Sequence, residues 1–273
     1  MNMKQERHAA YSMIKVYLAI LVGMVYGASG LKAQSLPFKP ESSFQAGEEL
    51  HYKLRYGFVT AADAVLSVKD SELQFSTPHA FHLSAWGKTS NAFGVLFPVD
   101  NRYNSYIDSK SFLPFFYTEN IREGKYRRTD VVRFDHGNRK VEGNKGTFSS
   151  PTGQTFDLVS AYYFARNLDL NRVKPGQSFK LSYFLNDEIA TLGIEYIGTE
   201  TIETALGPLE CLKFSPELKP GRVFKKDSKM YLWVTNDGNR IPVRAQVEIL
   251  VGSVYLELTK ATGLKYPLGQ PLP

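Results

Sequence analysis

Two adjacent carboxylates, Asp187 and Glu188, have the residue types and spacing that acid–base chemistry requires. Glycoside hydrolases use two carboxyl groups that flank the scissile bond, so Asp187 could pair with Asp157 or Asp130 once the chain folds. Both residues follow Asn186 in a predicted turn, where adjacent carboxylates are usually solvated. We therefore predict no catalytic residue, and a hydrolase of envelope glycan that uses Asp157, Asp187 or Glu188 is an alternative hypothesis.

The histidines show no metal-binding pattern. Four of them follow the N-terminal segment, and none has the spacing of a His-Glu-x-x-His motif or acidic partners at ligand distance in the sequence: His51, His79, His82 and His136. The sequence also has no Gly-x-Ser-x-Gly motif and no glycine-rich phosphate loop before a helix. We predict no bound metal and no cofactor.

Cys211 is the one cysteine of the chain, which excludes an internal disulfide. It lies in the alternating segment Leu209–Phe214, and this pattern predicts a buried, unreactive thiol in a strand. Packing alone must therefore hold the core together. A domain of this length can bury roughly 70–75% of the surface of its unfolded chain, which suffices.

Aromatic side chains are the main binding chemistry that the sequence offers. There are 16 Tyr and 18 Phe but only two Trp, and a tyrosine has an apolar body and a polar tip that suit the wall of a cleft. Core packing explains most of these residues. The predicted lining of a ligand cavity is Trp86, Tyr103, Tyr162, Tyr163, Arg166 and Trp233.

A basic run extends from Gly221 to Lys226 and is followed by Lys229. It could bind an anionic head group or an envelope phosphate, with Arg222 and Lys225 as the anion-binding residues. Charged side chains also protect an exposed edge strand from aggregation. A solvated edge strand is thus the competing interpretation of this run.

The elements that position these residues are strands and one helix. Residues 156–167 are predicted as the main α-helix, which Thr155 or Asp157 can cap. The segment has a broad apolar face that includes Tyr162 and Tyr163, and Arg166 suits the C-terminal end of the helix dipole. A helix of about three turns is unstable alone in water. We expect it to dock on the sheet through its tyrosines.

The rest of the mature chain alternates apolar and polar residues with the period of a β-strand. The predicted strands are 50–56, 61–68, 81–86, 103–108, 114–121, 130–135, 140–142, 179–185, 192–196, 200–204, 210–214, 229–234, 242–250 and 253–259. Residues 144–153 are predicted as a loop. The apolar segment 89–98, with Phe93, Val95, Leu96 and Phe97, is either a lip over a pocket or lipid surface, or a short buried strand or loop plug.

The two halves on either side of the helix resemble each other at an offset of about 128 residues. Gly47 and Pro114 are 67 residues apart, and Gly176 and Pro242 are 66 residues apart, with similar strand patterns between them. We predict pseudo-repeats at about 46–150 and 175–262, joined by the helix. The competing interpretation is that such glycine, strand and proline patterns are common in β proteins. Each proline should begin its strand or lie at an edge or bulge.

The N-terminus has the pattern of a secretory signal peptide. A basic start at Lys15 precedes the apolar run Val16–Gly30, and small residues surround an expected cleavage site near Ala33. The run is shorter than the roughly 20 residues that span a bilayer; an uncleaved N-terminal anchor is the alternative. No cysteine stands near Ala33, which excludes a lipid-modified N-terminus.

Removal of residues 1–33 takes away four basic side chains and one acidic side chain, so the net charge falls from +6 to +3. This small excess and the export signal argue against nucleic acid as a partner. We expect a soluble exported protein, periplasmic or in the cell envelope, without a transmembrane segment in the mature chain. Residues 34–45 are predicted as an irregular leader, 46–264 as one all-β domain and 265–273 as a flexible tail.

Four segments resemble the exported bacterial proteins of domain-of-unknown-function family 3108: Tyr56–Ala62, Asp157–Tyr163 with Arg166, Gly221–Lys225, and Leu232–Val234 with Ile241–Arg244. The resemblance covers roughly Phe44 to Leu264 and implies export and an all-β body with one helix, but no activity. The pattern around Trp233 and Pro242 is also loosely similar to the open barrels of lipoprotein-localisation factors, which hold acyl chains in a concave sheet.

We expect an all-β fold in which two related antiparallel sheets form an open barrel or sandwich, with one main α-helix. The favoured function is non-catalytic binding of a lipid or other amphiphilic small molecule in the concave sheet. A structural or interaction module that binds another envelope protein is the second hypothesis, and the glycan hydrolase is the third.

Overall fold

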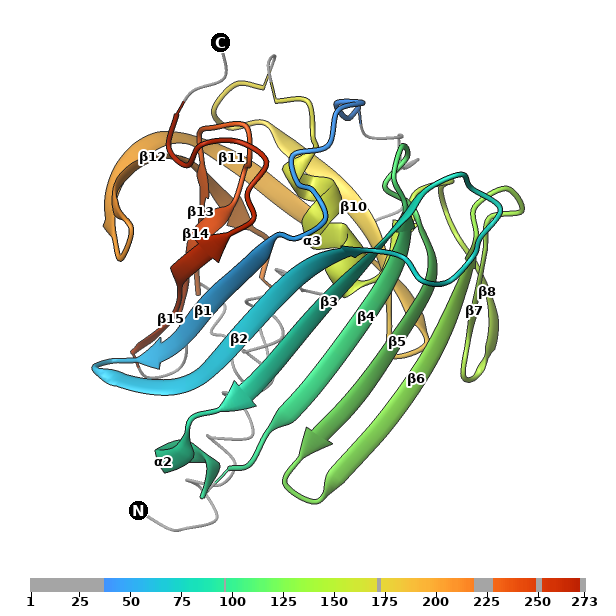
Figure 1. Ribbon diagram of the computed structural model, residues 1–273, viewed down its shortest axis with the longest axis horizontal. Helices are drawn as coiled ribbons and strands as arrows, with labels where there is room; N and C mark the ends of the chain where they lie inside the picture. Colours follow the sequence, from blue (N-terminus) through green and yellow to red (C-terminus); the bar gives the residue numbers. More distant parts are fainter. Residues whose placement is uncertain (1–36, 96, 171–172, 219–227, 249–251, 271–273) are drawn as a thin grey trace.

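The computed structural model describes residues 37–95, 97–170, 173–218, 228–248 and 252–270. Within them the chain forms one large, strongly curved sheet around one main helix (Figure 1). The strand order is β8-β7-β6-β5-β4-β3-β2-β1-β15-β14-β13-β12-β11-β10-β9. Neighbouring strands pair antiparallel except β9 and β10, which are parallel. Since β8 and β9 are edge strands, the sheet does not close into a barrel.

The first half of the sheet is a meander, because each strand pairs with the next one along the chain. Its strands are β1 (Glu49–Tyr56), β2 (Val59–Asp70), β3 (Ala80–Thr89), β4 (Asp100–Asp108), β5 (Pro114–Glu123), β6 (Tyr126–Asp135), β7 (Lys140–Gly143) and β8 (Gly146–Ser149). The short helix α2 (Asn91–Gly94) lies in the loop between β3 and β4.

The second half begins with a short strand before the helix α3 (Leu158–Arg166), and its remaining strands form a second meander after the helix. Its strands are β9 (Thr155–Phe156), β10 (Ser178–Leu185), β11 (Glu188–Thr204), β12 (Gly207–Pro216), β13 (Met230–Thr235), β14 (Pro242–Glu248) and β15 (Ser253–Thr262).

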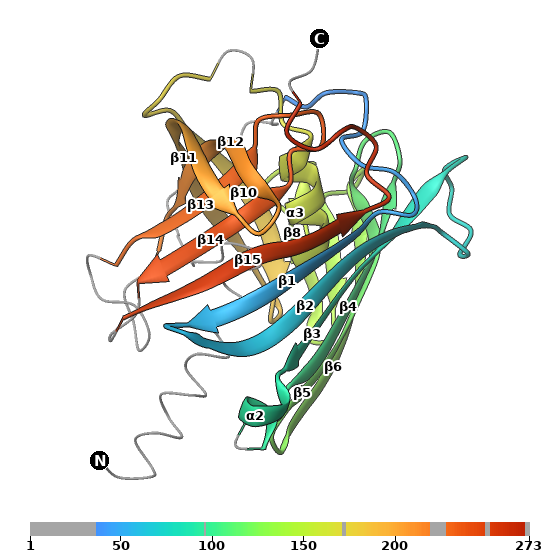
Figure 2. The ribbon, with the colours of Figure 1, turned by 60° about the vertical axis from the view of Figure 1, so that its left-hand side comes forward.

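Pairing of β1 with β15 joins the two halves, with a register from Glu49 opposite Thr262 to Tyr56 opposite Val254. The all-β fold with one main helix is thereby confirmed. The two predicted sheets are one continuous sheet, because the first and last strands of the domain satisfy each other's backbone groups instead of remaining edges. Figure 2 shows β14, β15, β1 and β2 side by side across this junction.

The core lies on the concave face of the sheet. Along β2 every second residue is buried, namely Ala62, Ala64, Leu66 and Val68, and the residues between them are more exposed. This is the alternation that a half-buried strand requires. The sequence predicted the shared face of Ala64, Leu66 and Val68, and the structure confirms it.

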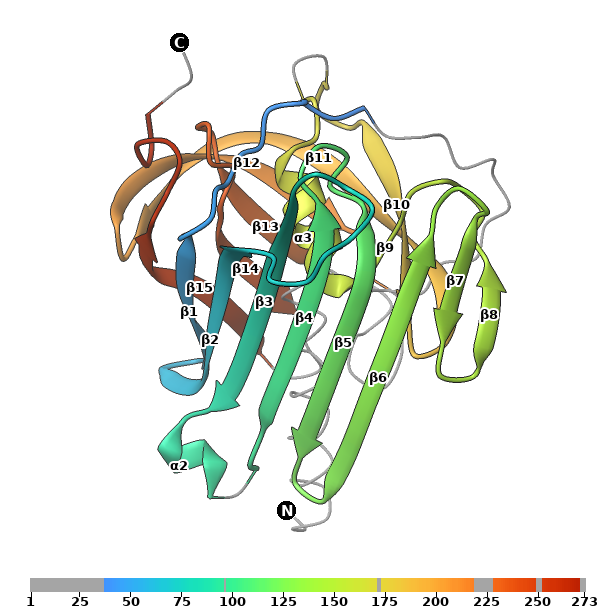
Figure 3. The same cartoon turned by 45° about the vertical axis from the view of Figure 1, so that its right-hand side comes forward.

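Helix α3 lies in the concavity between the two halves, as Figure 3 shows behind β3 and β4. It contacts β3 and β4 of the first half and β9 and β10 of the second. Asp157 caps it, since its Oδ1 accepts hydrogen bonds from the amides of Val159 and Ser160 at 2.8 and 2.9 Å. The helix begins later than predicted, because Thr155 and Phe156 pair as β9 with β10.

Two strand predictions need correction. Residues 144–153 were predicted as a loop, but Gly146–Ser149 form the edge strand β8. The segments 192–196 and 200–204 were predicted as two strands, but they are parts of the long strand β11. A register shift between Tyr196 and Gly198 bends this strand, and Gly198 supplies the required positive φ of 148°.

Both prolines begin their strands, as predicted: Pro114 starts β5 and Pro242 starts β14. Each is also paired just beyond a register shift, the first opposite Ile107 and the second opposite Val234. Proline has no amide hydrogen to donate to a ladder, so these positions cost no hydrogen bond. The internal duplication itself stays a prediction.

The chain segments before β1 and after β15 lie against the domain. Phe44 is fully buried, and Phe38 forms an isolated bridge with Leu168. Near the C-terminal end, the amide of Tyr266 donates to Asn239 at 3.0 Å, and the amide of Gly269 donates to Asp237 at 2.7 Å.

The predicted signal peptide lies outside the described residues. Among those residues, no helix is long and apolar enough to cross a membrane.

Candidate functional site

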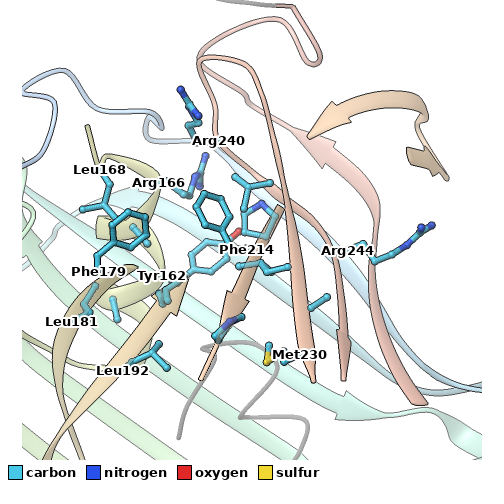
Figure 4. Close-up of a pocket in the computed structure, with 18 of the residues that line it drawn as sticks. Tyr162, Arg166, Leu168, Phe179, Leu181, Leu192, Phe214, Met230, Arg240 and Arg244 are labelled. Atoms are coloured by element: carbon cyan, nitrogen blue, oxygen red, sulfur yellow. The ribbon is translucent and has the colours of Figure 1, made fainter. Parts of the chain in front are cut away.

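An apolar cavity of about 100 Å³ lies between α3 and the second half of the sheet (Figure 4). Ala161 and Ala165 form part of the helix side. The sheet side comes mainly from β10 to β14, whose lining residues include Phe179, Leu181, Leu192, Ile194, Phe214, Met230, Leu232 and Val234. These residues lie two apart along their strands, so the pleat directs them to the same face. Nearly all of the lining is hydrocarbon.

The two tyrosine hydroxyls at the cavity form hydrogen bonds with each other and with a backbone carbonyl. The Tyr52 hydroxyl donates to the carbonyl of Pro242 at 3.0 Å, so the Tyr162 hydroxyl is the donor in the 2.9 Å bond between the two tyrosines. Burial raises the pKa of Tyr162 to about 12. Both tyrosines therefore stay neutral at physiological pH and present mainly ring carbon to the cavity.

Arg166 ends the helix beside the cavity, but its guanidinium is fully engaged. It forms a two-point ion pair with Glu48, donates from Nε to the carbonyl of Asn239 at 3.0 Å and also reaches the Ser43 carbonyl. Burial by itself lowers the pKa of Arg166, yet the Glu48 carboxylate raises it above its usual value. Arg166 thus connects segments of the fold, and all three of its guanidinium nitrogens donate hydrogen bonds within the protein.

Of the other predicted cavity residues, none lines this cavity. Tyr163 is fully buried and packs edge-on against Phe44 with ring centroids 4.9 Å apart. Tyr103 is buried on β4 in the first half. Trp86 is half-exposed and donates to Asp100, while Trp233 donates to Glu200 at 3.1 Å. Of the six predicted residues, the structure brings only Tyr162 and Arg166 to the cavity.

Arg240, which the sequence did not single out, lies at one end of the cavity next to Arg166 (Figure 4). Its Nη1 atom is buried and makes no hydrogen bond to any described residue. Arg240 also lines two more polar hollows, of about 430 and 200 Å³. The one sequence signal was its place two residues before Pro242. That signal says nothing about the partners of the side chain.

A family model described as "Protein of unknown function (DUF3108)" matches residues 51–259. The chain belongs to this family. No curated protein sequence matches it. Among solved structures, a β-barrel-like protein of domain-of-unknown-function family 1849 from Brucella abortus is 8% identical, with a TM-score of 0.46 over 78% of this chain and 96% of that one. A protein with a YmcC-like fold from Bacteroides fragilis is 14% identical, with a TM-score of 0.37 over 84% and 100%.

Asp157, one of the carboxylates weighed for hydrolysis, has only structural partners among the described residues of this DUF3108 chain. Asp157 caps α3 and also accepts hydrogen bonds at Oδ2 from the hydroxyls of Ser105 and Ser160, at 2.6 and 2.8 Å. Burial raises the pKa of Asp157. Glu188 begins β11 and is exposed. Asp157 therefore has a structural task that fully occupies its carboxylate.

Asp187 and Asp130 do meet, on either side of Arg128. Arg128 contacts both carboxylates, and its Nε lies 3.6 Å from Oε1 of the buried Glu119. Burial raises the pKa of Glu119 to about 7. The three carboxylates are buried, and through Arg128 they connect the β10–β11 turn to strands β5 and β6. The arrangement indicates a structural charge cluster.

Among the described residues, the remaining predicted chemistry gives no further site. Arg222 and Lys225 lie outside the described residues. No cluster of three or more His, Cys, Asp or Glu side chains that could hold a metal occurs in the part of the chain that the structure describes. Cys211 is buried in β12, and burial raises the pKa of its thiol to about 12. The thiol is therefore protonated at physiological pH.

Proposed function

We propose that this DUF3108 protein is an exported, non-catalytic protein that binds an amphiphilic molecule of the cell envelope, with the apolar chain of the ligand in the cavity between α3 and strands β10 to β14. The single observation that carries the proposal is that cavity. It is lined almost wholly by apolar side chains, and its tyrosine hydroxyls are bonded to each other and to the backbone. Such a surface attracts hydrocarbon and offers polar ligands little.

The size of the cavity suggests the shape of the ligand. Its volume of about 100 Å³ is well below the roughly 300–1,000 Å³ of sites that enclose drug-sized molecules. A narrow acyl or alkyl chain fits such a space better than a ring system does.

Binding without catalysis is favoured by the state of the acidic residues. Asp157 is committed to capping α3, and Asp130 and Asp187 are bound to Arg128. None of the three lines the apolar cavity. Export is supported by the basic start and the short apolar run before Ala33.

Native mass spectrometry of the chain isolated from its own cells tests the proposal, together with binding of 1-hexadecanol to the delipidated chain. We expect a co-purifying amphiphile and saturable hexadecanol binding. Ala165→Phe, which places a ring in the cavity, should remove both. Leu73→Phe adds the same ring at a half-exposed loop position and is the matched control. If neither molecule binds, or if Ala165→Phe binds as the wild type does, the proposal is wrong.

A further inference from the structure

Arg240 is a cation at the boundary between apolar and polar space. It lines the apolar cavity and also the hollow of about 430 Å³ that contains Lys39 and Glu41, and the carboxylate of Glu41 is paired with Lys265. An amphiphile has the same division, with a hydrocarbon chain and a polar head. The position of Arg240 is therefore the place where the head of a ligand in the cavity would lie.

The guanidinium of Arg240 retains unused hydrogen-bonding capacity. Its Nη1 is buried and has no acceptor among the described residues, although a buried donor without a partner is costly. Burial lowers the pKa of Arg240, while Asp237, Tyr196 and Asp169 act in the opposite direction. An anionic oxygen at Nη1 would remove the cost of the missing acceptor.

The other arginines of the cavity differ in this respect. Arg166 is bound by Glu48, and Arg244 donates from Nε to Glu257 at 3.2 Å and from Nη2 to the carbonyl of Glu203 at 2.8 Å. Figure 4 shows the Arg244 side chain directed away from Tyr162 and Phe214. Of these three arginines, Arg240 is the one with a buried nitrogen that makes no hydrogen bond to a described residue.

The backbone holds Arg240 firmly in this place. Oδ1 of Asp237 accepts from the amides of Asn239 and Arg240 and from the Thr235 hydroxyl, and Oδ2 accepts from the amide of Gly269. The carboxylate of Asp237 is thus occupied by the turn. Arg240 itself has a φ of 52°, in the left-handed region that a non-glycine residue adopts only at a cost.

The first half of the chain has an apolar residue at the corresponding place. Phe112 stands two residues before Pro114, as Arg240 stands two residues before Pro242, and it also has a positive φ, of 59°. Phe112 is fully buried in the core. An aromatic side chain therefore suits this kind of turn, and packing does not require a cation there.

We infer that Arg240 binds the anionic head group, a carboxylate or a phosphate, of an amphiphile whose chain occupies the apolar cavity, with Lys39 adding positive charge on the polar side. This inference rests on the proposed function and specifies the charge of the ligand. Arginine can donate two parallel hydrogen bonds to two oxygens of a carboxylate or of a phosphate, so both head groups are suitable.

Calorimetric titration of the purified full chain tests the inference with palmitate, hexadecyl phosphate, 1-hexadecanol and inorganic phosphate. We expect both anionic amphiphiles to bind more tightly than hexadecanol. Arg240→Gln should weaken the anionic amphiphiles about tenfold or more, the usual effect of losing a charged hydrogen bond. It should leave hexadecanol binding unchanged. Arg240→Lys should retain part of the preference, and Arg102→Gln, at an exposed position on β4 outside the cavity, should behave as the wild type.

The outcomes separate the head-group inference from the proposed function. If hexadecanol and palmitate bind equally well and Arg240→Gln changes neither, the inference about Arg240 is wrong while an apolar site stands. Inorganic phosphate that binds as tightly as hexadecyl phosphate would identify a site for a free anion and overturn the inference. If no hexadecyl compound binds, the proposed function fails, and the inference fails with it.

Discussion

Arg166 and Glu48 form a two-point ion pair in the interior, with Nη1–Oε1 at 2.6 Å and Nη2–Oε2 at 2.8 Å. Both side chains are almost completely buried. Glu48 immediately precedes β1, whereas Arg166 is the last residue of α3, 118 positions later. The pair therefore fixes the end of the helix to the start of the first strand. It also explains why a buried arginine is tolerated beside an apolar cavity.

Removing one partner of this pair should strongly destabilise the fold. Glu48→Ala leaves a buried guanidinium without its carboxylate, and we expect a loss of about 3–5 kcal/mol in the free energy of unfolding, measured by urea denaturation. Glu48→Leu combined with Arg166→Met should recover much of that loss. Arg102→Ala breaks the largely exposed pair with Asp100 and should cost less than about 1 kcal/mol. Equal losses at the two sites would contradict the assignment.

Two buried tyrosines should respond oppositely to the loss of a hydroxyl. The Tyr163 hydroxyl is buried and has no hydrogen-bond partner among the described residues, so Tyr163→Phe should leave stability unchanged or raise it by up to about 1 kcal/mol. The Tyr52 hydroxyl bonds to Tyr162 and to the carbonyl of Pro242. Tyr52→Phe should therefore cost about 1–2 kcal/mol. Chemical denaturation of both variants checks the contrast.

The carboxyl of Glu119 makes stability depend on pH. Burial raises its pKa from the ordinary 4.5 to about 7, and the neighbouring Asp130 acts in the same direction. Tyr117 donates to it at 2.8 Å, and Arg128 partly offsets the shift. Because the folded state favours the protonated form, its stabilising contribution is complete below about pH 4.5 and is lost as pH rises to about 7.

Glu119→Gln should remove this dependence. From pH 4.5 to 8, the unfolding free energy of the wild type minus that of Glu119→Gln should fall, by on the order of 1–3 kcal/mol. Urea denaturation at a series of pH values gives the difference. Glu142→Gln, at an exposed position on strand β7, controls for general effects of charge removal. A difference that stays constant with pH would show that the Glu119 carboxyl is not perturbed.

Gly143 should not tolerate a side chain, because the β10–β11 hairpin approaches it closely. A Cβ atom there would lie 2.6 Å from Cζ of Phe184 and 2.8 Å from Oδ1 of Asp187. We expect Gly143→Ala to lower the free energy of unfolding by about 1–3 kcal/mol and to lower the melting temperature accordingly. Gly137→Ala, where the nearest atom would be 3.6 Å away, should have little effect and is the control. Equal melting temperatures for the two variants would refute the close approach.

The sequence predicted those features that depend on neighbouring residues along the chain. Alternation of apolar and polar residues located nearly all strands and gave the buried face of β2. The capping residue Asp157, the strand starts at Pro114 and Pro242, and the family itself were also evident from local patterns. Helix capping and the alternation of a strand depend on residues that are close together in the sequence, so both can be recognised from the sequence alone.

Tertiary structure alone decided which of these elements meet. The pairing of β1 with β15 and of Arg166 with Glu48 connects residues far apart in the chain. Trp86 and Trp233 looked as suitable for a cavity as Tyr162, but the pleat and the curvature of the sheet place them away from it. Arg240 became a candidate only when its unpartnered Nη1 was seen between apolar and polar space. The type of a residue determines what its side chain can bind, whereas the curvature of the whole sheet determines which groups surround that side chain.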